Sequence, residues 1–177
     1  MRKQVRSQSS AGYSLVEMLV VVAMIGIISL VTVPNFISLY RASRMKSSLR
    51  NVTTVLRNAR MVAVTRLERT KVSFTPSGTR YAVYESKDGG TTWTQLGSDR
   101  DLEPRIYFST TSTFTDQDTD TFPDVIYMPN GTVNPVPDAT TNSGNVVLRT
   151  DDDIRSNEYT ININLNGRLG TTPAKWK

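Results

Sequence analysis

The longest apolar segment of the sequence lies close to the N-terminus and constrains the fold of everything that follows it. No charged residue occurs between Met18 and Val33. Extending the segment back to Tyr13 adds one charged residue, Glu17. About 20 residues, each adding about 1.5 Å, carry a helix across the hydrocarbon core of a bilayer. We therefore expect residues 13–34 to form a transmembrane helix.

The residues before this segment are basic and set its expected orientation. Arg2, Lys3 and Arg6 supply three positive charges to a chain whose formal net charge is +5. Such residues stay on the cytoplasmic side, so the C-terminal part would lie on the far side of the membrane. A secretory signal peptide is the alternative, but its apolar core is shorter and is followed by a small-residue cleavage site. Here the small residues precede the apolar segment, at 9–12.

Glu17 is an unusual residue for the start of such a segment. A carboxylate within lipid costs about 2.5 to 3.5 kcal/mol at the centre of a helix and less near its end. One interpretation is that Glu17 extends to the membrane surface. The other is that it meets a positive partner when the helix packs among copies of itself, and an amine created by cleavage just upstream would be such a partner.

The residues G-Y-S-L-V-E at 12–17, followed by the apolar run, resemble the processing site of type IV prepilins and type II secretion pseudopilins. The resemblance implies that residues 1–12 are a basic leader, which prepilin peptidase removes between Gly12 and Tyr13. It implies N-methylation of Tyr13 and an assembly role for Glu17, which would pair with the terminal amine of a neighbouring subunit. The implied location is the inner membrane, as a single-pass protein with a cytoplasmic N-terminus and a periplasmic C-terminal domain, and then a periplasmic filament. Its partners would be membrane lipid, the assembly platform, and other pseudopilins or pilins.

Beyond the apolar segment, residues 35–69 are expected to continue the same helix in amphipathic form. Apolar residues recur there at alternating spacings of three and four, which is the pattern of a helix with one buried face. They are Ala42, Met45, Leu49, Val52, Leu56, Ala59 and Ala63. The basic residues Arg41, Arg44 and Lys46 follow the apolar segment closely enough to meet lipid head groups, and a solvated face is the alternative that explains the basic residues of this helix more simply.

Residues 70–177 have the composition of a β-rich domain. Stretches rich in aromatic and β-branched residues alternate with turn signals such as Asn166-Gly167. The expected strands are 71–74, 81–84, 105–108, 125–128, 145–148 and 159–165. We therefore predict an α+β fold, in which a long N-terminal helix packs on a mainly antiparallel sheet.

The order of segments is similar to that of the GspH/FimT family of minor pseudopilins and minor pilins. The similarity rests on "LRNARMVAVTR" at the end of the helix, "YMPNGTV" and the terminal "LNGRLG". It implies a pilin-like fold and a minor pseudopilin subunit of a type II secretion pseudopilus. The alternative is a minor pilin of a type IV pilus, and some such pilins bind DNA through a basic C-terminal region.

The composition argues against an enzyme. The chain contains neither cysteine nor histidine, which removes thiol nucleophiles, the usual zinc ligands and the commonest general base.

An acidic stretch is the candidate metal site. Carboxylates at alternate positions on one loop are the ligands that Ca²⁺ requires. They belong to Asp116, Asp118, Asp120 and Asp124. The stretch departs from an EF-hand loop at Thr121, where glycine is expected, and at Tyr127, where a glutamate is expected. A solvated acidic loop without a metal is the alternative.

The basic end of the chain is the candidate nucleic-acid site. Cations beside an aromatic residue can contact a single strand or a phosphate backbone. The cations are Arg168, Lys175 and Lys177. Simple solubilising charge at a chain terminus is the alternative explanation.

Residues 86–93 fit the pattern S-x-D-x-G-x-T-W, which resembles the Asp box of sialidase-like propellers. In those proteins the aspartate and hydroxyls satisfy the backbone of a hairpin turn, and the tryptophan packs beneath it. We expect Asp88 to stabilise a hairpin here and to have no catalytic role.

Overall fold

The structure is a computed structural model that describes residues 14–114, 123–133, 143–150 and 158–172. The chain divides into two units, Met1–Arg41 and Ala42–Lys177. One helix, α1 (Leu15–Arg66), supplies the described part of the first unit and the start of the second.

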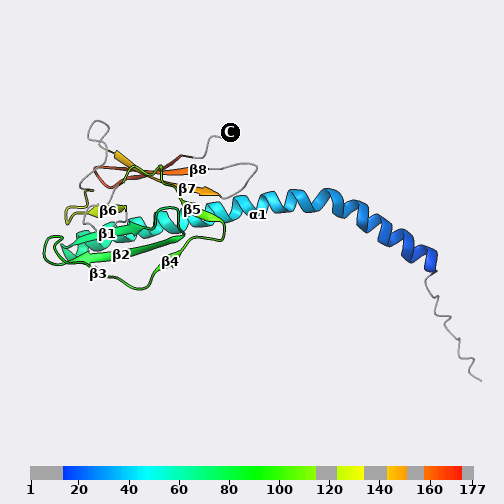
Figure 1. Ribbon diagram of the computed structural model, residues 1–177, viewed down its shortest axis with the longest axis horizontal. Helices are drawn as coiled ribbons and strands as arrows, with labels where there is room; N and C mark the ends of the chain where they lie inside the picture. Colours follow the sequence, from blue (N-terminus) through cyan, green and yellow to red (C-terminus); the bar gives the residue numbers. More distant parts are fainter. Residues whose placement is uncertain (1–13, 115–122, 134–142, 151–157, 173–177) are drawn as a thin grey trace, which may run out of the picture. The chain divides into compact units, whose positions relative to one another are not determined.

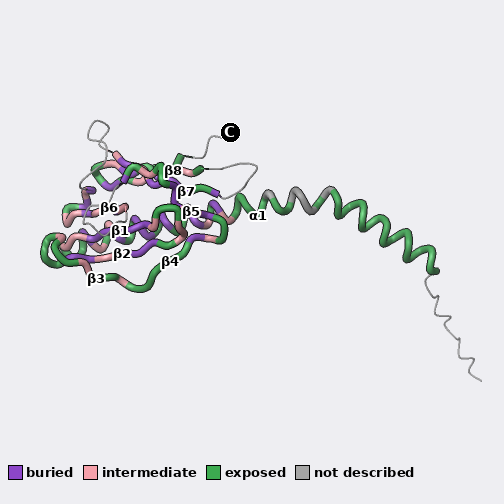
Figure 2. Tube along the Cα trace, in the orientation of Figure 1, coloured by how far each residue is buried: buried purple, intermediate pink, exposed green. Residues whose placement is uncertain are grey.

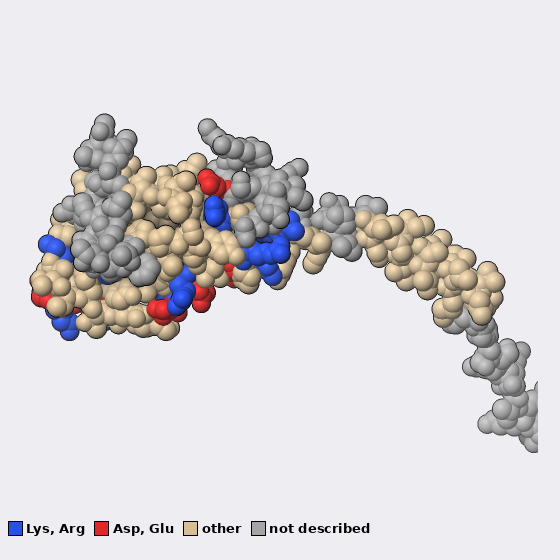
Figure 3. All heavy atoms as spheres, in the orientation of Figure 1, with Lys and Arg blue, Asp and Glu red and all other residues tan. Residues whose placement is uncertain are grey.

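The N-terminal unit consists, in its described part, of helical backbone with exposed apolar side chains. Leu15 and Leu30 are each 79% exposed, and the large apolar residues between them are also exposed, although to a smaller extent. In Figure 3 this part of the helix is tan, whereas basic and acidic side chains are interspersed over the globular unit.

Within the described residues, no helix has both the length and the apolarity that crossing a membrane requires. The transmembrane helix at residues 13–34 stays a prediction.

The second unit contains two antiparallel sheets, of which the first follows directly from the helix. Its strands lie in the order β3-β2-β1-β6, and β4 also pairs with β2. They are β1 (Arg69–Phe74), β2 (Arg80–Ser86), β3 (Thr94–Gln95), β4 (Arg100–Asp101) and β6 (Asp124–Tyr127). The β1–β2 hairpin is in continuous register from Arg69 opposite Ser86 to Phe74 opposite Tyr81.

The second sheet is built mainly from the C-terminal part of the chain. Its strands lie in the order β5-β7-β8-β9. They are β5 (Ile106–Phe108), β7 (Ser143–Thr150), β8 (Glu158–Asn164) and β9 (Leu169–Thr172). All three pairings are antiparallel.

The apolar face of α1 and both sheets share one hydrophobic core (Figures 1 and 2). From the helix, Val52, Leu56 and Ala63 are completely buried. The first sheet contributes Val72, Phe74, Val125 and Tyr127, and the second contributes Ile106, Phe108, Val146, Leu148, Ile161 and Ile163. Of the expected helical stripe, Ala42 is exposed because the core begins at Met45, and Leu49 is half-buried at the edge of the core.

In the described part of the globular unit, the contacts between the two sheets include one at Phe108 and one at the turns after β6 and β8. The ring of Phe108 on β5 lies with its centroid 4.9 Å from that of Phe74 on β1. Elsewhere the backbone N–H of Val133 donates to the carbonyl of Leu165 over 2.8 Å. The second contact brings together the turn after β6 and the turn after β8, which carry two of the segments on which the family resemblance rests.

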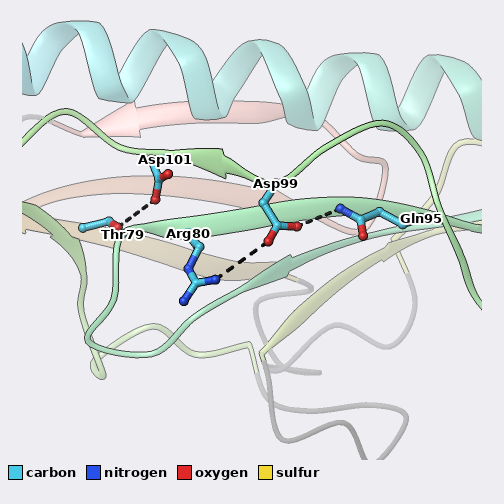
Figure 4. Close-up of polar contacts among 5 residues, drawn as sticks. All are labelled: Thr79, Arg80, Gln95, Asp99 and Asp101. Carbon is cyan, nitrogen blue, oxygen red and sulfur yellow. Dashed lines mark hydrogen bonds and ion pairs between the residues drawn. The ribbon is translucent and has the colours of Figure 1, made fainter.

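The short outer strands of the first sheet are held by polar side chains (Figure 4). Asp99 lies between two of them, accepting a hydrogen bond from Gln95 at 2.7 Å and facing the Arg80 guanidinium at 3.9 Å. The Thr79 hydroxyl donates to Asp101 over 2.9 Å. Since these groups are exposed, each contact adds little free energy.

The predicted α+β architecture is confirmed, and each of the six expected strand regions forms a strand. Two features differ from the expectation. The strands form two sheets, not one, because β6 pairs with β1, whereas β7 pairs with β5 on one side and with β8 on the other. The strands β3, β4 and β9 were not predicted, because they are short and contain no buried side chain to produce an apolar pattern.

Replacing Leu56 by alanine should lower the free energy of unfolding by about 2 to 5 kcal/mol, because its side chain is fully buried where helix and sheets meet. Thr54→Ala, at an exposed position on the same helix, should change it by less than about 0.5 kcal/mol. Denaturant unfolding of the full chain in detergent would measure both. Equal effects would contradict the assignment of the core.

Candidate functional site

Glu17 lies in the first turn of α1 and is exposed. Ser14 directly precedes the helix and stands three residues before Glu17, which is the S-x-x-E pattern of a helix N-terminus. Free backbone N–H groups and the helix dipole both favour a carboxylate at this end. Glu17 is therefore compatible with the start of the helix even without a partner from another chain.

Glu17 makes no hydrogen bond or ion pair with any other residue that the structure describes. Its carboxylate is therefore available to a group from outside this part of the chain. Gly12 and Tyr13, the expected processing residues, lie outside the described residues.

A basic groove lies on the globular unit, between the outer face of α1 and the turn from β8 to β9. Its volume is about 710 Å³. We call it the arginine groove, and its main lining residues are Arg57, Arg60, Met61, Val64, Arg168 and Leu169. Arg168, predicted from sequence as part of a basic tail, thus lies beside two arginines of the helix. Lys175 and Lys177 lie outside the described residues.

Arg60 is held in place by two glycine turns. Its Nε donates to the carbonyl of Gly131 over 2.9 Å. Gly131 and Gly167 both have a positive φ, at 79° and 68°, which glycine adopts without strain. A Cβ at Gly167 would lie 2.6 Å from the Gly131 carbonyl oxygen and 2.8 Å from the Arg60 Nε. Only a residue without a side chain fits there, so the two turns and Arg60 form one close-packed unit.

Arg60 also influences Tyr127, whose side chain is buried. Burial raises the pKa of Tyr127 well above its ordinary value, and the positive charge of Arg60 opposes that shift in part. The phenol therefore stays neutral at any physiological pH.

Asp124, predicted from sequence as a calcium ligand, is buried at the start of β6. Its Oδ2 lies 3.5 Å from the Nζ of Lys71, which is equally buried on β1. The Lys71 ammonium also lies 5.0 Å from the ring centroid of Tyr84 and 5.1 Å from that of Trp93. The structure therefore gives Asp124 a partner within the sheet, where the charge of each member compensates the desolvation of the other.

The other three expected calcium ligands, Asp116, Asp118 and Asp120, lie outside the described residues. Among the residues that the structure does describe, no group of three or more acidic side chains is placed to hold a metal ion.

The hairpin expected around Asp88 is confirmed. The Oδ1 of Asp88 accepts from the backbone N–H of Thr91 and Thr92 and from the hydroxyl of Ser86, and its Oδ2 accepts from the hydroxyl of Thr92. These hydrogen bonds, that from the Thr92 hydroxyl foremost, hold the pKa of Asp88 well below its ordinary value. Asp88 thus satisfies the turn that follows β2.

Sequence analysis did not identify the arginine groove. The arginines of the helix stand more than 100 residues before Arg168 in the chain. Both glycine turns could be recognised from Asn-Gly pairs, but nothing local indicates that the two turns meet on the same arginine.

A helix whose apolar N-terminal part is exposed, and whose C-terminal part shares a core with antiparallel sheets, defines the class of pilin-like proteins. The family model of type II transport protein GspH matches residues 48–167, and a prokaryotic N-terminal methylation motif matches residues 7–33. The chain belongs to the GspH family. Its members are structural subunits of the pilin and pseudopilin type. Comparison with curated protein sequences gives no match.

Solved structures with the same fold include both kinds of subunit. The type IV minor pilin FimU of Pseudomonas aeruginosa is 13% identical with a TM-score of 0.53, and the match covers 77% of this chain and 95% of FimU. The minor pseudopilin EpsH from the type 2 secretion system of Vibrio cholerae is 11% identical with a TM-score of 0.50, covering 75% of this chain and 95% of EpsH. At these identities the likeness shows the fold alone.

Gly167→Ala should destabilise the globular unit more than Gly97→Ala does. Both glycines have a positive φ, so each substitution costs about 1 to 2 kcal/mol in backbone strain. An added Cβ meets nothing within 4 Å at Gly97, whereas at Gly167 it meets the Gly131 carbonyl and Arg60. The difference between the two variants in denaturant unfolding therefore measures the packing of the two turns. Equal losses of stability would show that this packing is absent.

Proposed function

We propose that this chain is a minor pseudopilin subunit of a type II secretion pseudopilus. The observation that carries the proposal is the match of the GspH family model over most of the globular unit. The methylation motif at residues 7–33 supports an N-terminus that is processed and modified as in that class.

In the proposed pathway, the chain is first held in the inner membrane by residues 13–34, with the basic leader in the cytoplasm and the globular unit in the periplasm. Prepilin peptidase then cuts between Gly12 and Tyr13, and the new amine of Tyr13 is methylated. The apolar helix remains part of the mature subunit. Its many exposed apolar side chains would then be buried against the helices of neighbouring subunits, with the assembly platform supplying the site of insertion.

In this proposal, Glu17 determines how far the helix of one subunit is shifted along the helix of its neighbour. Its carboxylate is exposed in the first helical turn, without a partner among the described residues. The terminal amine of an adjacent subunit, retained as a cation after methylation, could neutralise it. In an apolar filament interior an unpaired carboxylate is costly, so packing that leaves Glu17 unpaired is disfavoured.

The second candidate is a minor pilin of a type IV pilus that binds DNA during uptake. The observation that favours it is the position of Arg168 beside two further arginines in one groove, since clustered cations attract phosphate. The fold is compatible with either filament.

Glu17→Ala and Glu17→Gln should each leave cleavage after Gly12 intact and should reduce incorporation into filaments roughly ten- to a hundredfold, the equivalent of one hydrogen bond to a charged group. Ser29→Ala is the matched control on the same helix, since the one hydrogen bond that the Ser29 hydroxyl makes to a described residue goes to the carbonyl of Ile25 one turn before it. Immunoblots of membrane and sheared-filament fractions would measure processing and incorporation separately. Normal incorporation of both Glu17 variants would contradict the role assigned to this residue.

A further inference from the structure

The arginine groove combines exposed apolar side chains with cations. Met61 is 61% exposed and Val64 is 45% exposed, although both lie on the half of α1 that packs in the globular unit. They stand on the helix face opposite Ala59 and Ala63, which are buried in the core. Met61 and Val64 therefore do not belong to the hydrophobic core. They form part of a surface that another molecule can contact.

Within the described part of the chain, the groove carries positive charge alone. Its described lining residues include no Asp or Glu. Among the described residues, no carboxylate pairs with Arg57 or Arg168. Arg66, the last residue of α1, differs from them because it forms an ion pair with Glu85 on β2. Three arginines thus line one open groove whose described lining contains no acid, which favours an anionic partner.

One of the three arginines is already ordered. Arg60 lines the groove while its Nε is bound to the Gly131 carbonyl and its stem is packed against Gly167. Fixing a long side chain before binding reduces the entropy lost on binding. A planar guanidinium in a fixed position is suited to a carboxylate, which it can bind through two parallel hydrogen bonds.

We propose that the arginine groove docks a segment of another subunit that carries carboxylates on one side and apolar side chains on the other. The arginines would bind the carboxylates, while Met61, Val64 and Leu169 would contact the apolar side. A nucleic-acid backbone would satisfy the cations but would leave the apolar lining exposed, which is why we favour a protein segment. The inference rests on the proposed function, because it treats the partner as a member of the same filament.

The test uses the full chain in the source bacterium, with a photo-reactive benzophenone amino acid at position 61. Adducts formed on illumination are identified by mass spectrometry of the linked peptide. The variant pair Arg57→Glu/Arg168→Glu reverses two charges of the groove. The control pair Lys87→Glu/Arg105→Glu makes the same charge change at exposed positions that do not line it.

The expected result is an adduct with a segment of another filament subunit that contains several Asp or Glu residues. Its yield should fall roughly tenfold or more in Arg57→Glu/Arg168→Glu and should be unchanged in the control pair. An adduct with nucleic acid, an adduct whose yield is insensitive to the charge reversal, or no adduct would overturn the proposal.

Processing and filament incorporation are scored in the same samples, so the two proposals can fail separately. If the chain is cleaved and incorporated but gives no such adduct, only the docking proposal fails. If the chain is neither cleaved nor incorporated, both proposals fail.

Discussion

Burial of one face of α1 between Met45 and Ala63 is the constraint on which the globular unit depends. Neither sheet could be stable with its apolar face in water, and the helix offers a single continuous stripe that shares a core with both. The same helix has exposed apolar residues throughout its described N-terminal part. One element therefore serves two purposes, because its C-terminal half organises a domain and its N-terminal half remains available for contacts with other molecules.

A second constraint acts at the turns after β6 and β8. Gly131 and Gly167 must approach each other closely, and Arg60 fills the remaining space. This arrangement connects the first sheet, the second sheet and the helix at one point. It also fixes the guanidinium of Arg60 at the edge of the arginine groove. The same contacts therefore stabilise the fold and position a cation that can bind a partner.

Much of this architecture could be predicted from the sequence, because its main elements follow local rules. The spacing of apolar residues after Ala42 indicated the helix, and alternation in segments such as 159–165 indicated the strands. The division into two sheets could not be predicted, since it depends on which strands pair over long distances. Asp124 shows the same limit for a candidate site. Its sequence neighbours are acidic and suggested either a calcium ligand or a solvated loop, and nothing local indicated that Asp124 would lie beside Lys71, more than 50 residues earlier.

The central claim is that this chain becomes a filament subunit when a leader is removed and a new amine is exposed four residues before Glu17. The mass and N-terminal sequence of the mature protein, purified from the membrane and filament fractions of the source bacterium, test it most directly. The account predicts a chain that begins at Tyr13 and carries a methyl group on its terminal nitrogen. A mature chain that retains residues 1–12, or that begins after the apolar segment, would contradict it.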